Sequence, residues 1–132
     1  MNMVEFLKKE LNMNFEAAVK HVTDTVVSGG FAHLMSKSLS AVFKKTLNID
    51  YAKYTMILAC SPKIAKAALD VSFNMGMLFP CSFVVYEENE KVYVAHVSIM
   101  KIGPEIGLAS IEEMQPVIKM TGEAVHKVWE QL

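Results

Sequence analysis

Two β-rich runs in the second half of the chain are separated by only three polar residues. The runs are residues 80–87 and 91–98, and the polar residues are 88–90. Valine, tyrosine and phenylalanine favour strands, and so short a polar connection between two such runs is typical of a β-hairpin. The sequence therefore predicts an antiparallel pair with a charged tip, in which Tyr86 and Tyr93 pack across the strands. A sheet that contains this pair is not purely parallel.

An apolar run, Tyr54 to Cys60, comes directly before the dipeptide Ser61-Pro62. A short continuous run of this kind is typical of a strand that is buried on both faces, so we expect it to be central in the sheet. Serine is a good helix N-cap, and proline is favoured at the first helical position. The sequence thus predicts a helix from Pro62 and a strand-to-helix corner at Cys60.

Helical and strand patterns account for the rest of the chain. A helix is expected from Asn14 to the Gly29-Gly30 pair, and another from Ser38 to Leu47. The last helix carries apolar residues from Met114 to Leu132, and Pro116 either starts it or kinks it. Residues 31–35 are predicted to form a short strand, residues 48–53 and the segment around Gly103-Pro104 and Gly107 to form loops, and residues 3–11 fit either a helix or a strand.

These elements predict an α+β fold. We expect residues 1–132 to form a single domain, with one mixed sheet of about five strands that includes the hairpin and is covered by about four helices. A chain of 132 residues that is 52% hydrophobic is long enough to bury its own core. Its mean hydropathy of +0.27 is high for a domain of this size, so we expect some apolar surface to be covered by a partner. A homodimer is the simplest such arrangement.

Charge and hydropathy exclude several classes of partner. The formal net charge is −1, and all 13 basic residues are lysine, so neither a basic surface nor arginine is present for nucleic-acid binding. The longest apolar stretch, Met75 to Tyr86, contains Gly76 and Pro80 and is too short to span a membrane. The first residues lack an apolar segment of signal-peptide length, so we expect a cytoplasmic protein with neither nucleic acid nor membrane as a partner.

Cys60 and Cys81 are the residues with the greatest chemical interest. Cys60 ends a predicted strand just before a helix, a position at which the helix dipole lowers the pKa of a thiol. Cys81 begins the next predicted strand, so the two thiols would share a pocket if these strands are neighbours. The alternative is that both cysteines are small apolar side chains of the core, because free cysteine is among the most buried residue types.

Two segments that contain these cysteines resemble a known family. Residues 57–69 (ILACSPKIAKAAL) and 76–98 (GMLFPCSFVVYEENEKVYVAHVS) are similar to the two signature stretches of the domain of unknown function 302 family. Those stretches read approximately hydrophobic-Ala-Cys-Asn-Pro and Leu-Pro-Cys-Asn-Val, and the resemblance extends over nearly the whole chain. It implies a compact α+β domain, often dimeric, in which residues 3–11 form the first strand.

The resemblance carries over to five positions of this chain, namely Cys60, Pro62, Gly76, Pro80 and Cys81. The asparagine that usually follows each cysteine is replaced by Ser61 and Ser82, which keep a short polar side chain and lose an amide. Because the activity of the family is not established, the resemblance implies a shape and a site without a reaction.

The sequence supports two hypotheses of different classes. In the first, the chain binds a small molecule or does redox or thiol chemistry at a pocket made by Cys60, Ser61, Pro62, Pro80, Cys81 and Ser82. In the second, it is a non-catalytic homodimeric interaction module, and both cysteines only pack the core. We assign no reaction class, cofactor or metal site from the sequence, and leave open whether the protein is an enzyme. His33 and His96 fall on predicted strands, where a lone histidine is more often a hydrogen-bonded structural residue.

Overall fold

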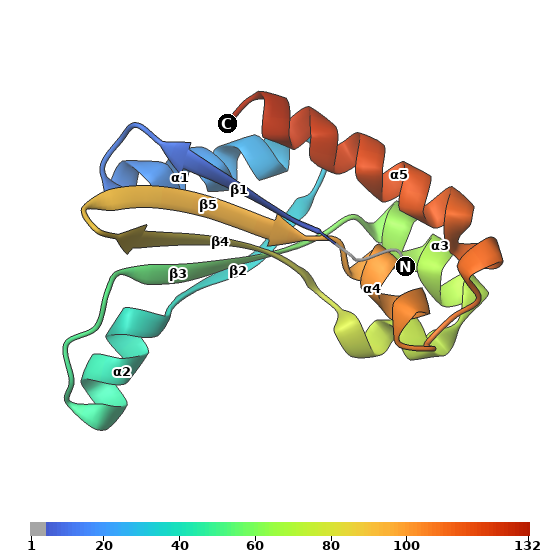
Figure 1. Ribbon diagram of the computed structural model, residues 1–132, viewed down its shortest axis with the longest axis horizontal. Coiled ribbons are helices and arrows are strands. Elements are labelled where there is room, and N and C mark those ends of the chain that lie inside the picture. The colour runs from blue at the N-terminus through green and yellow to red at the C-terminus, as the bar shows by residue number, and fades with distance from the viewer. Residues whose placement is uncertain (1–4) are drawn as a thin grey trace.

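The computed structural model describes residues 5–132 and is built on a five-stranded sheet with the strand order β1-β5-β4-β3-β2 (Figure 1). The strands are β1 (Phe6–Leu11), β2 (Ala32–Ser38), β3 (Tyr54–Cys60), β4 (Cys81–Glu88) and β5 (Lys91–Val97). The helices are α1 (Phe15–Ser28), α2 (Leu39–Leu47), α3 (Pro62–Val71), the 3₁₀ helix η1 (Phe73–Leu78), α4 (Ile99–Glu105) and α5 (Ile111–Glu130).

The α+β fold, the five strands and the hairpin are confirmed. The hairpin joins β4 to β5, and its two connecting residues, Asn89 and Glu90, both have positive φ angles (52° and 63°), as type I′ turns require. The segment that fitted either a helix or a strand forms β1, while its positions 3 and 4 lie outside the described residues.

The sheet is antiparallel at every pairing of the described chain, whereas a mixed sheet was expected. A parallel pair needs a connection that crosses the face of the sheet and returns to the same end. Figure 1 shows instead that α2 lies at one end of the strands and α3 at the other. The chain therefore turns back at each of these helices, and the strand that follows the helix pairs antiparallel with the strand that precedes it.

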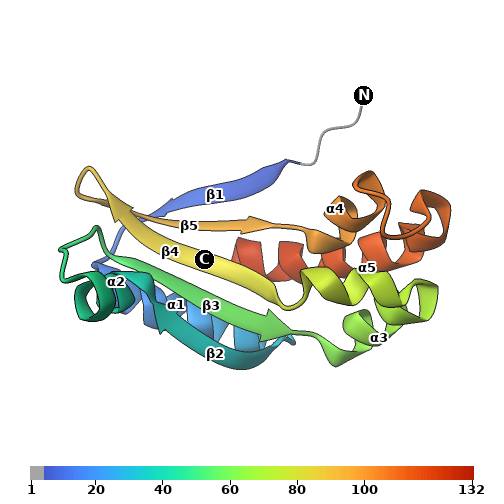
Figure 2. The same ribbon diagram turned by 90° about the horizontal axis from the view of Figure 1, so that it is seen from below.

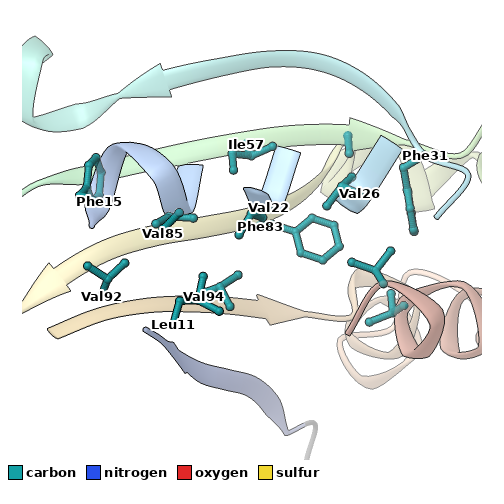
Figure 3. Packing of buried hydrophobic residues seen from close by; sticks show 14 residues of the cluster. Leu11, Phe15, Val22, Val26, Phe31, Ile57, Phe83, Val85, Val92 and Val94 are labelled. Atoms are coloured by element: carbon teal, nitrogen blue, oxygen red, sulfur yellow. The ribbon is translucent and has the colours of Figure 1, made fainter. Parts of the chain in front are cut away.

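One face of the sheet is covered by α1 and by the C-terminal half of α5 (Figures 1 and 2). Helix α1 begins as predicted, because the Asn14 side chain accepts a hydrogen bond of 2.8 Å from the Ala17 backbone N–H. The side chains in Figure 3 fill the space between these layers. The buried residues of this core are Leu11, Phe15, Ala18, Val22, Val26, Phe31, Ile57, Ala59, Phe83, Val85, Val92, Val94, Val125 and Val128.

A second core lies beyond the end of the sheet, where α3, η1, α4 and the N-terminal half of α5 meet. Its buried residues are Ile64, Ala68, Met75, Met100, Met114 and Val117. The segment around Gly103-Pro104 was expected to be a loop and forms the short helix α4, because Met100 is anchored in this core. Pro116 lies inside α5, which begins earlier, at Ile111, after the N-cap Ser110.

The other face of the sheet carries no helix that packs across it among residues 5–132, and we call it the open face (Figure 2). The side chains of β3 differ in burial between the two faces. Thr55, Ile57 and Ala59 on the covered face are buried, while Tyr54, Met56 and Leu58 on the open face are half-buried. The expectation that this strand is buried on both faces was therefore wrong for the single chain. Nor is β3 the middle strand, a place that belongs to β4.

A row of tyrosines crosses the open face. Tyr54 stacks on Tyr86 with a centroid distance of 5.6 Å, and Tyr86 contacts Tyr93 at the same distance, as the hairpin predicted. The Lys8 ammonium lies 4.4 Å from the centroid of the Tyr93 ring. The register also aligns Met56, Val84 and Ala95 as a second row, so the centre of the open face is apolar.

Candidate functional site

The antiparallel pairing of β3 with β4 brings the two sequence-predicted segments together at one end of the sheet. Cys60 is the last residue of β3 and Cys81 is the first residue of β4. Ala59 is the register partner of Cys81, so the two cysteines lie on adjacent strands within one residue of the same level. The expected corner exists, since α3 begins at Pro62 immediately after β3.

Four of the six predicted site residues line a common pocket at this corner, namely Cys60, Ser61, Pro80 and Cys81. Pro62 is exposed in the first turn of α3, and Ser82 lies outside the lining. Phe79, Ile64 and Met100 close the pocket with apolar surface. Its volume of about 10 Å³ has room for about one water molecule.

The thiol of Cys81 has the character of a core side chain. Burial, with a smaller contribution from the nearby Cys60 thiol, raises its pKa to about 11, because two thiolates would repel. Strand alternation places Cys81 on the helix-covered face together with Phe83 and Val85. At neutral pH this sulfur is therefore a protonated thiol, which is a poor nucleophile and a poor ligand for a metal.

His96 is a residue that the sequence interpretation left out of the site. Its ring is 5% exposed, its Nδ1 atom lies 2.8 Å from the Ser82 carbonyl oxygen, and it stacks on Phe83 with a centroid distance of 4.2 Å. Burial lowers the pKa of His96, while the hydrogen bond to Ser82 acts in the opposite direction. One signal was present in the sequence, because His96 alternates in phase with Val92 and Val94, both of which are buried.

Acidification is expected to destabilise the fold through His96. Burial lowers the pKa of His96 in the folded state below its ordinary value of 6.5, so the unfolded chain binds the proton first as the pH falls. This group contributes no pH dependence well above pH 6.5. Below that value the free energy of unfolding should fall by up to about 1.4 kcal/mol per pH unit, until the folded-state pKa is reached.

Urea unfolding at a series of pH values between about 7 and 5 would measure this slope. His96→Phe retains a flat ring against Phe83 and removes the titration. The variant loses the bond to Ser82, which lowers its stability at every pH, and should have the shallower slope. Equal slopes in the two proteins would contradict the prediction.

Metal binding has little support in this arrangement. Within residues 5–132 no group of three or more His, Cys, Asp or Glu side chains is placed to hold a metal ion. The corner offers two sulfur atoms, of which the Cys81 thiol is held protonated by burial.

Comparisons with known proteins agree on one family. The sequence model described as "Domain of unknown function DUF302" matches residues 7–132. The crystal structure of an uncharacterized conserved DUF302 protein from Bacillus stearothermophilus has a TM-score of 0.83 to this chain at 13% identity, and the likeness covers 96% of this chain and 98% of that one. No curated protein matches the sequence. Among the helices of the described chain, none is long and apolar enough to cross a membrane.

Proposed function

The chain belongs to the DUF302 family, whose function is unknown, and from its geometry we propose that it is a homodimeric interaction module in which two copies pack through their open faces. The observation that carries this proposal is the apolar centre of that face. Met56, Val84 and Ala95 form adjacent partners on three strands and are half-buried in the single chain. Phe6, at the edge of the same face, is 66% exposed.

The second helix enlarges this surface. Figure 1 shows α2 projecting from the end of the sheet on the side away from α1 and α5. Although α2 has apolar residues on one side, none of its side chains is buried against residues 5–132. Leu47, Ile49 and Tyr51, at the end of α2 and in the loop after it, are all exposed. Within the described chain, α2 contacts β3, and its Phe43 ring packs edge-on against Tyr51 with a centroid distance of 5.0 Å. A partner would add the further burial that normally stabilises an amphipathic helix.

The dimensions of the surface favour a second copy of the chain. Five strands spaced about 4.8 Å apart, with about seven residues at about 3.3 Å each, span on the order of 450 Å² in projection. This projected area is more than half of the roughly 800 Å² per partner that a standard interface buries, and α2 adds to it. A two-fold dimer uses the same surface of both copies, so it leaves neither open face exposed.

The edges of the sheet disfavour a dimer made by strand addition. Edge strand β1 carries the adjacent lysines Lys8 and Lys9, and edge strand β2 has a register irregularity between His33 and Met35. Charges and bulges at sheet edges hinder pairing with another chain. These features favour face-to-face packing of the sheet over strand addition.

Sedimentation velocity of Val84→Glu tests the proposal. Val84 lies at the centre of the open face, on the middle strand, where a buried charge without a partner would weaken association by about 100-fold or more. The wild type should sediment as a dimer at micromolar concentration and the variant as a monomer with an unchanged far-UV circular dichroism spectrum.

Ile111→Glu is the matched control, because it introduces the same charge at an exposed apolar residue far from the open face, in the first turn of α5. It should remain dimeric. A monomeric wild type, or a Val84→Glu protein as dimeric as the control, would refute the proposal.

In this proposal the cysteines are packing residues. The support is the narrow corner pocket and the raised pKa of Cys81, both of which suit a core position better than a reactive site. The hypothesis of thiol chemistry or ligand binding at Cys60 and Cys81 remains a prediction, and the labelling rate considered in the Discussion distinguishes the two.

A further inference from the structure

A larger cavity lies on the helix-covered side of the sheet, between β1, the end of β5 and α5. Its volume of about 310 Å³ falls at the low end of the range found for ligand pockets. Buried residues form its inner wall, whereas exposed side chains surround its mouth. The inner residues are His96, Thr121 and Val125, and those at the mouth include Glu5, Leu7 and Lys101.

The imidazole of His96 presents a hydrogen-bond acceptor to this cavity. A carbonyl oxygen can only accept, so the contact with Ser82 fixes the proton on Nδ1 and leaves Nε2 with a free lone pair. None of residues 5–132 donates a hydrogen bond to Nε2. The stacked Phe83 ring holds the imidazole in place. Because burial lowers its pKa, the ring is neutral at pH 7.

A second polar atom near the cavity also lacks a partner. The Ser98 Oγ atom is buried and makes no hydrogen bond within the described part of the chain. Ser98 is the N-cap residue of α4, yet its side chain forms no capping bond. A buried hydroxyl without a partner is costly, so this atom marks a strained place in the wall of the cavity.

Gly122 keeps one wall of the cavity open. It lies in the interior of the long helix α5, where glycine is less stable than alanine. A Cβ atom at this position would have no atom of residues 5–132 within 4 Å, so close packing does not require a glycine. Gly122 lines the cavity, and the missing side chain keeps that wall open.

We propose that this cavity is a binding site for a small flat molecule with an apolar body and one hydroxyl or ring N–H group. The donor group points inward to Nε2 of His96, while the body packs against Val125 and the half-buried Trp129. A carboxylate would place lone pairs against the lone pair of Nε2, so the site selects a donor over an anion. Glu5 and Lys101 at the mouth give that region mixed charge.

The test uses phenol as the probe and anisole as its matched partner, since anisole has the same ring and no donor. Titration of protein labelled with ¹⁵N at histidine follows the Nε2 resonance of His96. Phenol should shift this resonance and bind about tenfold or more tightly than anisole, because anisole leaves the buried acceptor unpaired.

Two variants locate the probe. Gly122→Phe places a ring in the open space of the cavity and should abolish phenol binding, while Lys119→Phe puts the same ring on an exposed position of the same helix and should bind normally.

Three results would each overturn the site. They are the absence of phenol binding at millimolar concentration, equal affinities for phenol and anisole, and binding that survives Gly122→Phe. The result of the phenol titration does not depend on the proposed dimer, because the cavity and the open face lie on opposite sides of the sheet. Sedimentation velocity measures dimerisation in a separate experiment.

Discussion

Phe83→Ala is expected to lower the free energy of unfolding by about 3–5 kcal/mol. Phe83 is fully buried on the middle strand and contacts the Phe31 ring edge-on, with a centroid distance of 6.0 Å. Its other neighbour is the stacked His96 ring. Alanine would leave a cavity between Phe31, which precedes β2, and His96 on β5. The backbone around this cavity is held by the sheet and cannot move in to close it. Because typical domains are stable by only about 5–15 kcal/mol, much of the margin would be lost.

Urea unfolding at pH 7 measures this loss. Val27→Ala is the control, since Val27 lies on the outer side of α1 with half of its side chain exposed, and a surface change of this kind alters stability by about 0.5 kcal/mol or less. If Phe83→Ala lowered the free energy of unfolding by less than about 1 kcal/mol, the side chains around position 83 would be able to repack. This core would then contribute less to stability than we expect.

Alkylation of Cys81 in the folded protein is expected to be at least about 100-fold slower than in the unfolded chain at pH 7. The reactive species is the thiolate, and its fraction falls about tenfold for each unit by which the pKa rises. Burial raises the pKa of Cys81 from 9.0 to about 11, so the chemistry alone gives this factor. Limited access in the corner pocket slows the reaction further.

Peptide mass spectrometry of the iodoacetamide-treated wild-type protein separates the rate at Cys81 from that at Cys60 and keeps the Cys60 thiol, which contributes to the raised pKa. The same protein in urea supplies the reference rate, and native labelling that follows global unfolding would support the packing role. Native and unfolded rates within a factor of a few would instead favour the hypothesis that the cysteine corner binds a ligand or does thiol chemistry.

The local elements were predictable because they depend on neighbouring residues. Asn14 caps α1, Pro62 starts α3, and Tyr86 meets Tyr93 across the hairpin, each as the sequence indicated. The end of the first helix was also correct, since Gly29 caps α1. In each of these cases the deciding interaction spans only a few residues of the chain.

The errors have the opposite origin, since they concern what an apolar segment packs against. The run from Tyr54 to Cys60 is apolar on both faces, and periodicity cannot tell whether a helix of the same chain or a second molecule covers each face. Similarly, the Gly103-Pro104 segment carries turn residues, yet the contacts of Met100 with the second core hold it as a helix. Tertiary contacts override local preference at both places.

The candidate site was predicted in part. The sequence put Cys60 at the end of one strand and Cys81 at the start of the next and left open whether these strands are neighbours, and the pairing of β3 with β4 shows that they are. It did not indicate how little space lies between them, because volume depends on Phe79 and Met100, which arrive from other elements. The cavity beside His96 was out of reach for the same reason, since its walls come from β1, β5 and α5.

The strand order has a consequence for how the chain acquires its structure. Strands β2, β3 and β4 each pair with the next strand along the sequence, so the strands from β2 to β5 can assemble progressively as synthesis proceeds. Strand β1 emerges first, yet its partner β5 follows after most of the chain, with Phe6 opposite Val97. The entropy of closing so long a loop makes β1 the natural last addition to the sheet. Until then the edge of β5 stays unpaired, so the nascent protein depends on its earliest residues to complete its latest strand.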